Sequence, residues 1–416
     1  MPDPTSGSTP GQRVPRFGAN YTPSRDWWHA WQDWDRASIG SDLQNLAGLG
    51  LDHIRAHCLW PVFQPNPNRV SRTALDHLEE LLDLAGDVGL DVSVTVLNGW
   101  LSGFAFYPAW KMPRADAAAR NMFTDPGMIA AEKLLFSRLA ERIAGHPRFL
   151  GFDLGNELGV LQFGADAVNL AQGDAWQAEL FAHLEQVAPG RLHVNGVDHQ
   201  QWFATRGFSR RSLATLGAAT SVHAWIEFTG ALERYGPNGV GSLHLAEYCI
   251  ELAKAFHEDP ARRVWLQEFG ASSRWMPVEA IPGFSAATIA NALDCDHLWG
   301  LTWWCSHDLN AELSGFHPLE YDLGLFDQAN REKPVAGRLR EVIADARAGG
   351  VNPPTRTLGL VLPGAGLHGA LPDWGFAARY MELIDQGERP AVVLEERAGN
   401  AAYLAARGIA KLVFIA

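Results

Sequence analysis

The chain has 416 residues, of which 47% are apolar and 19% are charged, a composition typical of a folded globular protein and not of a disordered or fibrous one. Its formal net charge is −13 and no run of Lys or Arg occurs, which argues against nucleic acid or an anionic membrane as the partner, because each needs a concentrated basic patch. The 16 tryptophans exceed what a core of this size needs, and a broad apolar face with one N–H suits sugar rings as well as cores.

The N-terminal stretch precedes any regular pattern. Residues 1–15 are rich in Pro, Ser, Gly and Thr and lack the apolar run of a signal peptide, so we expect a disordered leader. No later segment is long and apolar enough to span a bilayer, and we expect a cytoplasmic protein with a small, imported substrate. The scattered cysteines lack CxxC spacing and indicate reduced thiols, neither a zinc site nor a disulfide scaffold: Cys58, Cys249, Cys295 and Cys305.

A strand-then-helix alternation runs from residue 16 to residue 347. Runs such as DVSVTVL are typical of strands covered on both faces, and residues 75–88 and 128–143 carry apolar residues at helical spacing. Eight such units predict a (β/α)₈ TIM barrel with enlarged loops. A doubly wound sheet would need a glycine-rich phosphate turn after the first strand, and NYTPSRDWW is nothing like one. The expected strands are 16–22, 52–60, 91–98, 149–157, 191–198, 220–227, 263–270 and 300–308.

A Gly/Pro-rich segment, AGGVNPPT at residues 348–355, predicts a linker after the barrel. The alternation then resumes over residues 356–416, which predicts a small parallel α/β appendage with strands at 357–362, 391–395 and 411–415. The last of these strands, KLVFIA, is apolar with nothing to cover it. Either the appendage is truncated or this edge pairs with another chain, and we expect the appendage to support a homo-oligomer or to brace the barrel.

Barrel enzymes carry their chemistry at the C-terminal ends of strands, where ionisable groups must be neutralised or used. Glu157 ends the fourth strand in FLGFDLGNE and Glu268 ends the seventh in VWLQEFG, so the two carboxylates could face each other across the barrel mouth. A separation of roughly 5–5.5 Å would fit a covalent glycosyl-enzyme route. Glu268 would attack the anomeric carbon, while Glu157, its pKa raised by its neighbour, would act as acid and base. The alternative is a buried ion-pair network.

GNE at the fourth strand and LQEFG at the seventh resemble the clan of barrel glycosidases that includes glycoside hydrolase family 5. The resemblance covers the barrel and implies roles for further residues. Arg55 in HIRAHCLW is similar to the arginine that orients the nucleophile, and His223 in SVHAW resembles the sixth-strand histidine. Trp304 in TWWCSHD resembles the tryptophan that forms the sugar platform, and Asn156 is the asparagine of the NE pair.

The segments NYTPS, WWHAW, GLDHIR, LWPVFQPNP, NMFTDP and LGNE resemble the bacterial β-mannosidase branch of that family, subfamily 18. This resemblance implies action on small β-mannosides such as Man-β-1,4-GlcNAc, with no cofactor and no metal. Two positions depart from the family pattern. Asn98 stands where family 5 commonly has a histidine, and Trp225 replaces the usual sixth-strand tyrosine, although an indole N–H could still donate to a carboxylate.

Other residues carry a functional and a structural alternative. Trp100, in the loop after the third strand, is expected to stack on sugar more than to fill core, and His199 after the fifth strand is a candidate for a hydroxyl contact. Asp308 could bind the nonreducing end or form a structural salt link. His53 and His57 share a strand face without an acidic partner of zinc-hydrolase type, which favours structural histidines. For the group Trp27, Trp28, Trp31 and Trp34, substrate lining and packing under the loop are equally expected.

Three functions are consistent with these observations. The first is a retaining exo-β-mannosidase acting on a small oligosaccharide. The second is an endo-β-mannanase or β-glucosidase of the same clan, which loop shape at the pocket would decide. The third is a carbohydrate-binding barrel that has lost catalysis, whose expected sign is the loss of one carboxylate. Both carboxylates, Glu157 and Glu268, are present.

Overall fold

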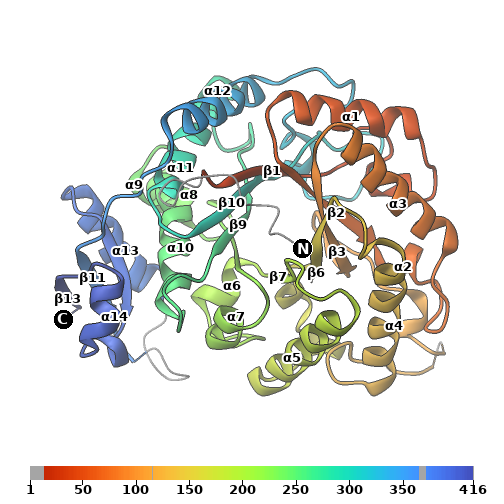
Figure 1. The fold of residues 1–416 in the computed structure, drawn as a ribbon, viewed down its shortest axis with the longest axis horizontal. Helices are drawn as coiled ribbons and strands as arrows, with labels where there is room; N and C mark the ends of the chain where they lie inside the picture. Colours follow the sequence, from red (N-terminus) through yellow and green to blue (C-terminus); the bar gives the residue numbers. More distant parts are fainter. Residues whose placement is uncertain (1–13, 115, 365–371, 416) are drawn as a thin grey trace.

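The computed structural model describes residues 14–114, 116–364 and 372–415, so the predicted leader lies almost wholly outside the described residues. Eight parallel strands form one sheet in the order β7-β6-β3-β2-β1-β10-β9-β8, and helices surround it (Figure 1). The predicted TIM barrel is confirmed. The strands are β1 (Arg16–Asn20), β2 (His53–Leu59), β3 (Asp91–Asn98), β6 (Phe149–Asn156), β7 (Val194–Gly196), β8 (Thr220–His223), β9 (Val264–Phe269) and β10 (Leu298–Trp303).

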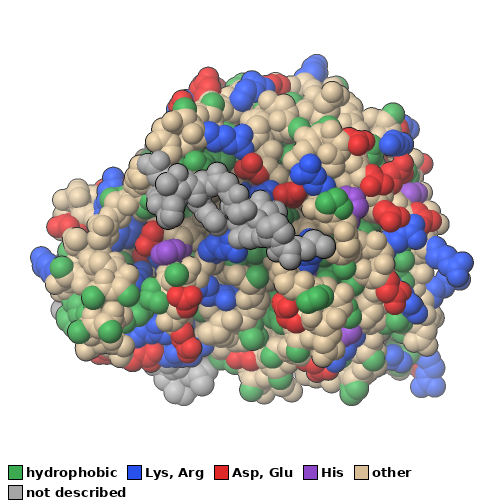
Figure 2. Space-filling model, viewed as in Figure 1, with side chains coloured by type: hydrophobic (Ala, Val, Ile, Leu, Met, Phe, Trp, Pro, Cys, Tyr) green, Lys and Arg blue, Asp and Glu red, His purple; other side chains and the backbone are tan. Residues whose placement is uncertain are grey.

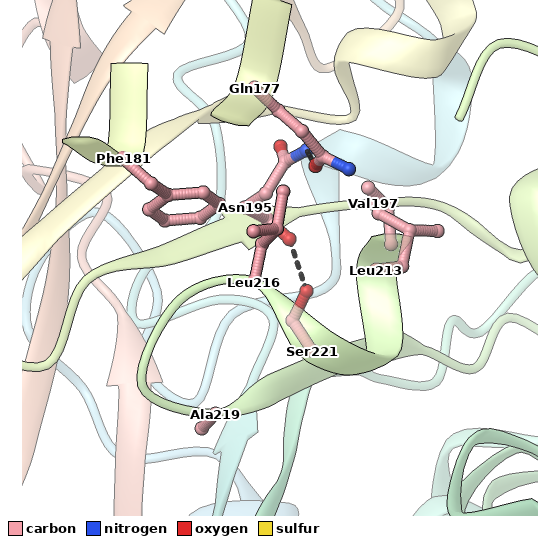
Figure 3. Close-up of a pocket in the computed structure, with 8 residues that line it drawn as sticks. All are labelled: Gln177, Phe181, Asn195, Val197, Leu213, Leu216, Ala219 and Ser221. Atoms are coloured by element: carbon pink, nitrogen blue, oxygen red, sulfur yellow. Dashed lines mark hydrogen bonds between the residues drawn. The ribbon is translucent and has the colours of Figure 1, made fainter. Parts of the chain in front are cut away.

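The barrel closes between β7 and β8, the two ends of the strand order. The Ser221 hydroxyl of β8 donates to the Asn195 carbonyl of β7 (Figure 3). Gln177 and Phe181, from the outer helix α5 (Leu170–Val187), line a small cavity between β7 and β8. Side-chain contacts thus join the two strands that no backbone ladder joins among the described residues.

The helices start and stop where local chemistry requires. Helix α3 (Arg72–Asp87) is capped at its N-terminus by Ser71, whose hydroxyl accepts the Ala74 N–H. After the helix the chain turns away at Gly89, which has φ +85°. The other principal outer helices are α1 (Arg36–Gly48), α4 (Pro126–Ile143), α5 (Leu170–Val187), α10 (Leu245–Ala255), α11 (Ile281–Leu293) and α12 (Pro334–Gly349). Short helices at the loops are α2 (Trp60–Phe63), α6 (His199–Phe203), α7 (Arg210–Thr215), α8 (Ala231–Tyr235) and α9 (Val240–Leu243).

The predicted bounds differ most from the structure in three strands. β7 is shorter than 191–198, β8 stops at His223 instead of residue 227, and β10 runs from Leu298 to Trp303 instead of 300–308. In the last case pairing decides the start, because Leu298 is in register with Val264 of β9. After Trp303 the backbone turns into the loop above the barrel, where apolar residues such as Trp304 are buried although they belong to no strand. Apolar composition alone does not separate these two situations.

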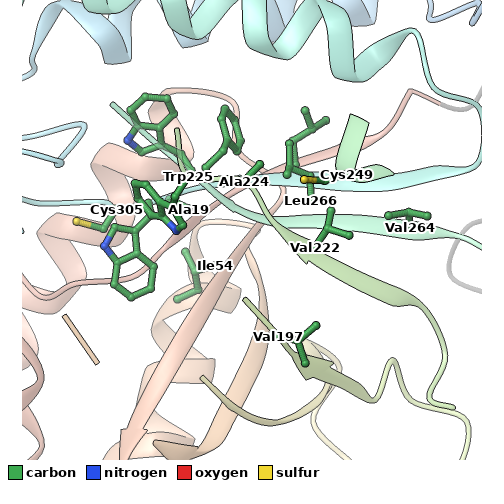
Figure 4. Packing of buried hydrophobic residues seen from close by; sticks show 14 of the residues in the cluster. Ala19, Ile54, Val197, Val222, Ala224, Trp225, Cys249, Val264, Leu266 and Cys305 are labelled. Atoms are coloured by element: carbon green, nitrogen blue, oxygen red, sulfur yellow. The ribbon is translucent and has the colours of Figure 1, made fainter. Parts of the chain in front are cut away.

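The core explains most of the tryptophans. Trp27, Trp28 and Trp31 are buried in the 3-10 helix η1 (Trp27–Trp31) and its surroundings, and the indole N–H groups of Trp28 and Trp31 donate to the Tyr21 and His57 carbonyls. These contacts favour packing over substrate lining for this group. Figure 4 shows Trp225 among buried residues of the barrel interior.

The outer surface carries both signs of charge. Lys and Arg side chains are interspersed with Asp and Glu over the face in Figure 2 instead of gathering by sign. Among the described residues, no helix is both long enough and apolar enough to cross a membrane.

The C-terminal residues form a second, smaller parallel sheet in the order β12-β11-β13, which confirms the predicted α/β appendage. Its strands are β11 (Leu358–Leu362), β12 (Pro390–Leu394) and β13 (Lys411–Phe414), with helices α13 (Trp374–Asp385) and α14 (Ala401–Ala406). Figure 1 shows this unit in blue beside α10. The KLVFIA strand is therefore paired on one side, with β11. The boundary at 348–355 and self-association through the appendage stay predictions.

A buried ion-pair network joins the appendage to α10 of the barrel. Arg356 lies 2.6 Å from Glu247 and 3.5 Å from Glu251, and Arg407 lies 2.9 Å from Glu251. Lys254 completes the network at 2.6 Å from Glu251. Burial alone would raise the pKa of Glu251, but the three cations together lower it to about 2. The appendage thus supplies two of the charges that neutralise carboxylates buried in the barrel wall.

Removing one of these cations should destabilise the whole chain. We expect Arg356→Met to cost about 3–5 kcal/mol of unfolding free energy, because it leaves Glu247 buried without the Arg356 guanidinium. Denaturant unfolding measures the loss. Arg338→Met is the matched control, since Arg338 pairs with Glu341 on an exposed face of α12 and should cost about 1 kcal/mol or less. Equal effects of the two variants would contradict a bracing role for the appendage.

Candidate active site

The two predicted carboxylates meet at the C-terminal end of the barrel. Glu268 is the penultimate residue of β9, and Glu157 directly follows β6. Glu157 has φ 47° and ψ 44°, a left-handed conformation that is costly for a non-glycine residue, and its N–H donates to the Gly196 carbonyl of β7. Strained backbone of this kind is retained where its surroundings fix it, and it directs this side chain toward the barrel axis.

His223, at the end of β8, lies between the carboxylates. Its Nδ1 is 2.9 Å from Glu157 Oε1 and 3.3 Å from Glu268 Oε2. One oxygen of each glutamate and a His223 nitrogen all lie within 4.8 Å of one another. The Trp225 indole donates to Glu268 Oε2 at 3.2 Å, so the contact expected from the tryptophan in place of tyrosine is present.

Arg55 of β2 supplies the positive charge of the site. Its Nη1 donates to Glu268 Oε1 at 2.6 Å, and its Nε and Nη2 donate to Asp153 Oδ2 at 2.9 and 2.7 Å. Arg55 and Asp153 are fully buried. Asp153 also accepts hydrogen bonds from the Gly196 N–H and from the Gln267 amide. The guanidinium is thereby fixed in one orientation against Glu268.

Burial dominates the electrostatics. It raises the pKa of Glu157 to about 7 against the opposing charge of Arg55. It also raises the pKa of Glu268 to about 7; the charge of Glu157 adds to this effect, whereas His223 and Arg55 oppose it. The sequence predicted that the facing carboxylate raises the pKa of Glu157. In the structure desolvation is the largest cause of the rise, and the repulsion between the two carboxylates adds to the raised pKa values of the pair.

Glu157, His223 and Glu268 are the group of described residues whose atoms lie close enough together to hold a metal ion. However, the Arg55 guanidinium already occupies one side of Glu268 at 2.6 Å, and the Trp225 N–H occupies another. A cation would compete with both donors. The arrangement therefore favours proton transfer and nucleophilic attack over metal ligation.

Asn98, Asn156 and Trp100 lie next to the carboxylates. Asn98 uses its polar atoms on the backbone: it donates to the Cys58 and Thr95 carbonyls and accepts the Asn156 N–H. Asn156 donates to the Trp100 carbonyl at 3.3 Å, while its buried Oδ1 has no partner among the described residues. These contacts favour a bracing role for Asn98 and leave Asn156 able to bind a ligand. The Trp100 ring is half-buried in the short hairpin of β4 (Trp100–Leu101) and β5 (Phe104–Ala105).

Trp304 is held by a carboxylate that the sequence analysis did not single out. The Trp304 indole and the Ser102 hydroxyl both donate to Glu320 Oε2, at 3.1 and 2.9 Å. Glu320 comes from the 3-10 helix η6 (Pro318–Tyr321), in the long loop after β10. Burial raises its pKa to about 7, and the charge of Glu157 contributes. No motif marks Glu320, because only the path of the loop brings it to the site.

The remaining candidates differ in placement. His199 begins α6 after β7, and burial lowers its pKa to about 4. Its neighbour Asp198 is buried, with Oδ1 unpaired among the described residues, and burial and then the charge of Glu157 raise its pKa. Asp308 accepts hydrogen bonds from Lys333 Nζ at 2.7 Å and from the Gly324 N–H at 2.8 Å. These contacts favour the structural salt link for Asp308.

The histidines of the second strand are structural by their contacts. His53 shares a hydrogen bond with the Thr302 hydroxyl, and His57 with Asn20 Oδ1. Both are fully buried in the barrel.

Comparison with solved structures identifies the family; no family model and no curated protein matches the chain. A GH5_18 structure from Streptomyces cattleya in complex with GlcNAc is 40% identical, with a TM-score of 0.92, over 97% of this chain and 99% of that one. A GH5_18 variant from Bifidobacterium longum subsp. longum in complex with Manβ1-4GlcNAc is 34% identical, with a TM-score of 0.89, over 96% of both chains.

An exo-β-1,4-mannosidase from Opitutaceae bacterium strain TAV5 is 26% identical, with a TM-score of 0.75, over 92% of this chain and 70% of that one. The GH5_18 matches extend through the barrel and the appendage alike, since they cover nearly the whole chain. With a TIM barrel and two strand-end glutamates at its mouth, this chain is a glycoside hydrolase and belongs to subfamily 18 of family 5.

Proposed function

We propose that the protein is a retaining exo-β-mannosidase that hydrolyses Man-β-1,4-GlcNAc and similar short β-mannosides. The observation that carries the proposal is the pair Glu157 and Glu268, which have one oxygen each within 4.8 Å of the other. Of these two carboxyls, Glu268 is the one that accepts a hydrogen bond from Arg55. A short separation of this kind suits a nucleophile, whereas an inverting enzyme needs room for a water molecule between its carboxyl groups. The GH5_18 enzymes crystallised with Manβ1-4GlcNAc support the choice of substrate.

The two carboxyls differ in their donors, and this difference assigns their roles. Glu268 receives hydrogen bonds from Arg55 and Trp225, which stabilise its ionised form, so it attacks the anomeric carbon. Among the described residues His223 is the hydrogen-bond partner of the Glu157 carboxyl, whose raised pKa of about 7 lets it hold a proton up to that pH, so it protonates the leaving oxygen. After the GlcNAc leaves, Glu157 takes a proton from water, which attacks the mannosyl–Glu268 ester and regenerates both groups.

The loop at residues 309–326 supports exo action. The His317 N–H donates to the Ser102 carbonyl of the β4–β5 hairpin, and the Ser272 hydroxyl after β9 donates to Asp322. The loop is therefore tied at one side to the segment after β3 and at the other to the segment after β9. Glu320 of this loop contacts Trp304, so we expect the loop to restrict the space that a polysaccharide would need across the mouth. A chain end fits such a site better than an internal segment.

The other named residues fit around this chemistry as proposals. Trp304, held by Glu320, would carry the mannose ring, and Asn156 would bind a hydroxyl through its free Oδ1. Trp100 would stack on a sugar and His199 would contact a hydroxyl, as the sequence suggests. A cytoplasmic location stays a prediction of the sequence.

A panel of aryl β-glycosides tests the substrate class. We expect kcat/KM for the β-mannoside to exceed that for the β-glucoside and β-galactoside, with Man-β-1,4-GlcNAc cleaved and mannan polymer left intact. Chromatography of the products separates the cases. Fragmentation of mannan into oligosaccharides would indicate an endo enzyme, and a preference for glucoside would indicate a β-glucosidase.

The raised carboxyl pKa values predict a bell-shaped pH dependence of kcat/KM. The active form holds one proton on the pair, so acid conditions inactivate it by protonating Glu268. The pKa of Glu157 in the folded protein is about 7 instead of 4.5, so its proton persists to that pH and is lost above it. The basic limb should therefore fall near pH 7. Activity that stayed constant well into the alkaline range would contradict Glu157 as the acid.

A further inference from the structure

A chain of hydrogen bonds, buried as far as His223, runs from Asp153 to the candidate acid Glu157. The Gln267 amide donates from Nε2 to Asp153 Oδ2 at 3.0 Å, and Gln267 Oε1 lies 3.1 Å from His223 Nε2. His223 Nδ1 then lies 2.9 Å from Glu157 Oε1. Gln267, His223 and Asp153 are all 0% exposed, so water does not compete for the links between them, whereas the Glu157 side chain is 16% exposed.

The direction of each hydrogen bond follows from its neighbour. Asp153 is an acceptor, since Arg55 donates two N–H groups to the same oxygen and the Gly196 N–H donates to the other. The Gln267 NH₂ therefore faces Asp153, and its carbonyl oxygen faces His223. A carbonyl oxygen only accepts. The proton of a neutral His223 must consequently sit on Nε2, which leaves Nδ1 with a lone pair.

We propose that Gln267 is a positioning residue that fixes the His223 tautomer and thereby keeps the catalytic proton on Glu157. With its Nε2–H committed to Gln267, a neutral His223 can accept at Nδ1 but cannot donate there. The hydrogen bond to Glu157 forms only when the carboxyl itself supplies the proton. The proposal rests on the acid/base role proposed above for Glu157.

A competing arrangement has the same number of protons. If His223 carried both protons, Nδ1–H would lie between the two carboxylates, since Glu268 Oε2 is 3.3 Å away. Burial is the largest influence on His223 and lowers its pKa; the Arg55 charge acts in the same direction, whereas Glu268, the Gln267 hydrogen bond and Asp153 oppose them without reversing the shift. Glu268 already has the Arg55 and Trp225 donors, so it does not need this one. Neutral His223 with protonated Glu157 is therefore favoured.

The titratable and charged groups around His223 and the Glu157 carboxyl come from five segments. They are Arg55 and His57 from β2, Asp153 with Glu157 at the end of β6, Asp198 and His199 after β7, Glu268 from β9 and Glu320 from the loop after β10. Gln267 differs from all of them because it carries no charge. Its effect is exerted through its hydrogen bonds and not through a charge, so a neutral substitution can remove it without altering the charge balance.

The tautomer can be read directly by NMR on the full chain labelled with ¹⁵N-histidine. The His223 signal is assigned by its absence from His223→Asn, among 15 histidines. At neutral pH we expect one protonated nitrogen, Nε2, in the wild type. A proton on Nδ1, or on both nitrogens, would overturn the proposal. This result requires no turnover, so it is independent of whether the enzyme cleaves mannosides.

Gln267→Met removes the acceptor with little change in volume and provides the kinetic test. His223 can then carry its proton on Nδ1 and donate to an ionised Glu157, which should move the basic limb of kcat/KM to lower pH by about one unit. Thr95→Val is the matched control, because Thr95 donates to the same Asp153 oxygen at 3.2 Å but is not hydrogen-bonded to His223. Its basic limb should stay in place. An unmoved limb in Gln267→Met, or equal shifts in both variants, would overturn the positioning role.

Discussion

Glu268→Gln should lower kcat on an aryl β-mannoside by on the order of 10⁴-fold or more while the protein stays folded. The amide cannot form the glycosyl ester, so the reaction loses its first step and not merely one stabilising contact. Glutamine is preferred to alanine because it keeps an oxygen to accept the Arg55 Nη1–H, which would otherwise be buried without a partner. Steady-state kinetics together with thermal unfolding measure both parts of the expectation.

Trp225→Phe is the control for this experiment. It removes the indole donor to Glu268 Oε2 but leaves the carboxylate and Arg55 in place. A loss of one hydrogen bond to a charged group corresponds to about 1.5–3 kcal/mol, roughly 10- to 100-fold in rate, far below the loss expected for Glu268→Gln. Near-wild-type turnover in Glu268→Gln would remove the residue from the nucleophile's role.

Glu157→Ala should lose roughly 10²–10⁴-fold on a disaccharide, whose leaving group needs protonation. An aryl substrate with a good leaving group should still form the mannosyl–Glu268 ester, which then accumulates because no base activates water. Added azide needs no base to attack that ester, so it should restore turnover and yield β-mannosyl azide. Mass spectrometry of the protein and NMR of the product follow the two stages.

The same azide treatment of Glu268→Gln separates the two roles. That variant has no ester to attack, so rescue giving the β azide should be absent. If azide left Glu157→Ala inactive on the activated substrate, the assignment of Glu157 as acid and base would fail, whereas the assignment of Glu268 would stand on its own test.

The strand-end chemistry was predictable from the sequence because it depends on position along short apolar runs. A charged residue that ends such a run must lie at the barrel mouth, and the structure brings Glu157, Glu268, Arg55 and His223 together there. The contact of Trp225 with Glu268 was also predictable, because an indole N–H can replace a phenolic donor to the carboxylate. Near-continuous apolar strands likewise predicted the barrel.

The site residues that the sequence analysis missed are placed by the path of loops or belong to buried polar networks. Glu320 reaches Trp304 through a loop after β10 that has no periodic pattern to interpret. Asp153 and Gln267 were overlooked inside strands, although a charged or amide side chain within an apolar run is itself a signal of a buried partner. Trp27 and Trp28 were ambiguous because a tryptophan suits a sugar site and a core equally well.

The retaining mechanism is tested most directly by ¹H NMR of the first sugar released from Man-β-1,4-GlcNAc. Two displacements at the anomeric carbon, the first by Glu268 and the second by water activated by Glu157, restore the starting configuration. The account therefore predicts that mannose first appears as the β anomer and that the α anomer grows in later by mutarotation. First appearance of the α anomer would show a single displacement by water and would contradict Glu268 as nucleophile.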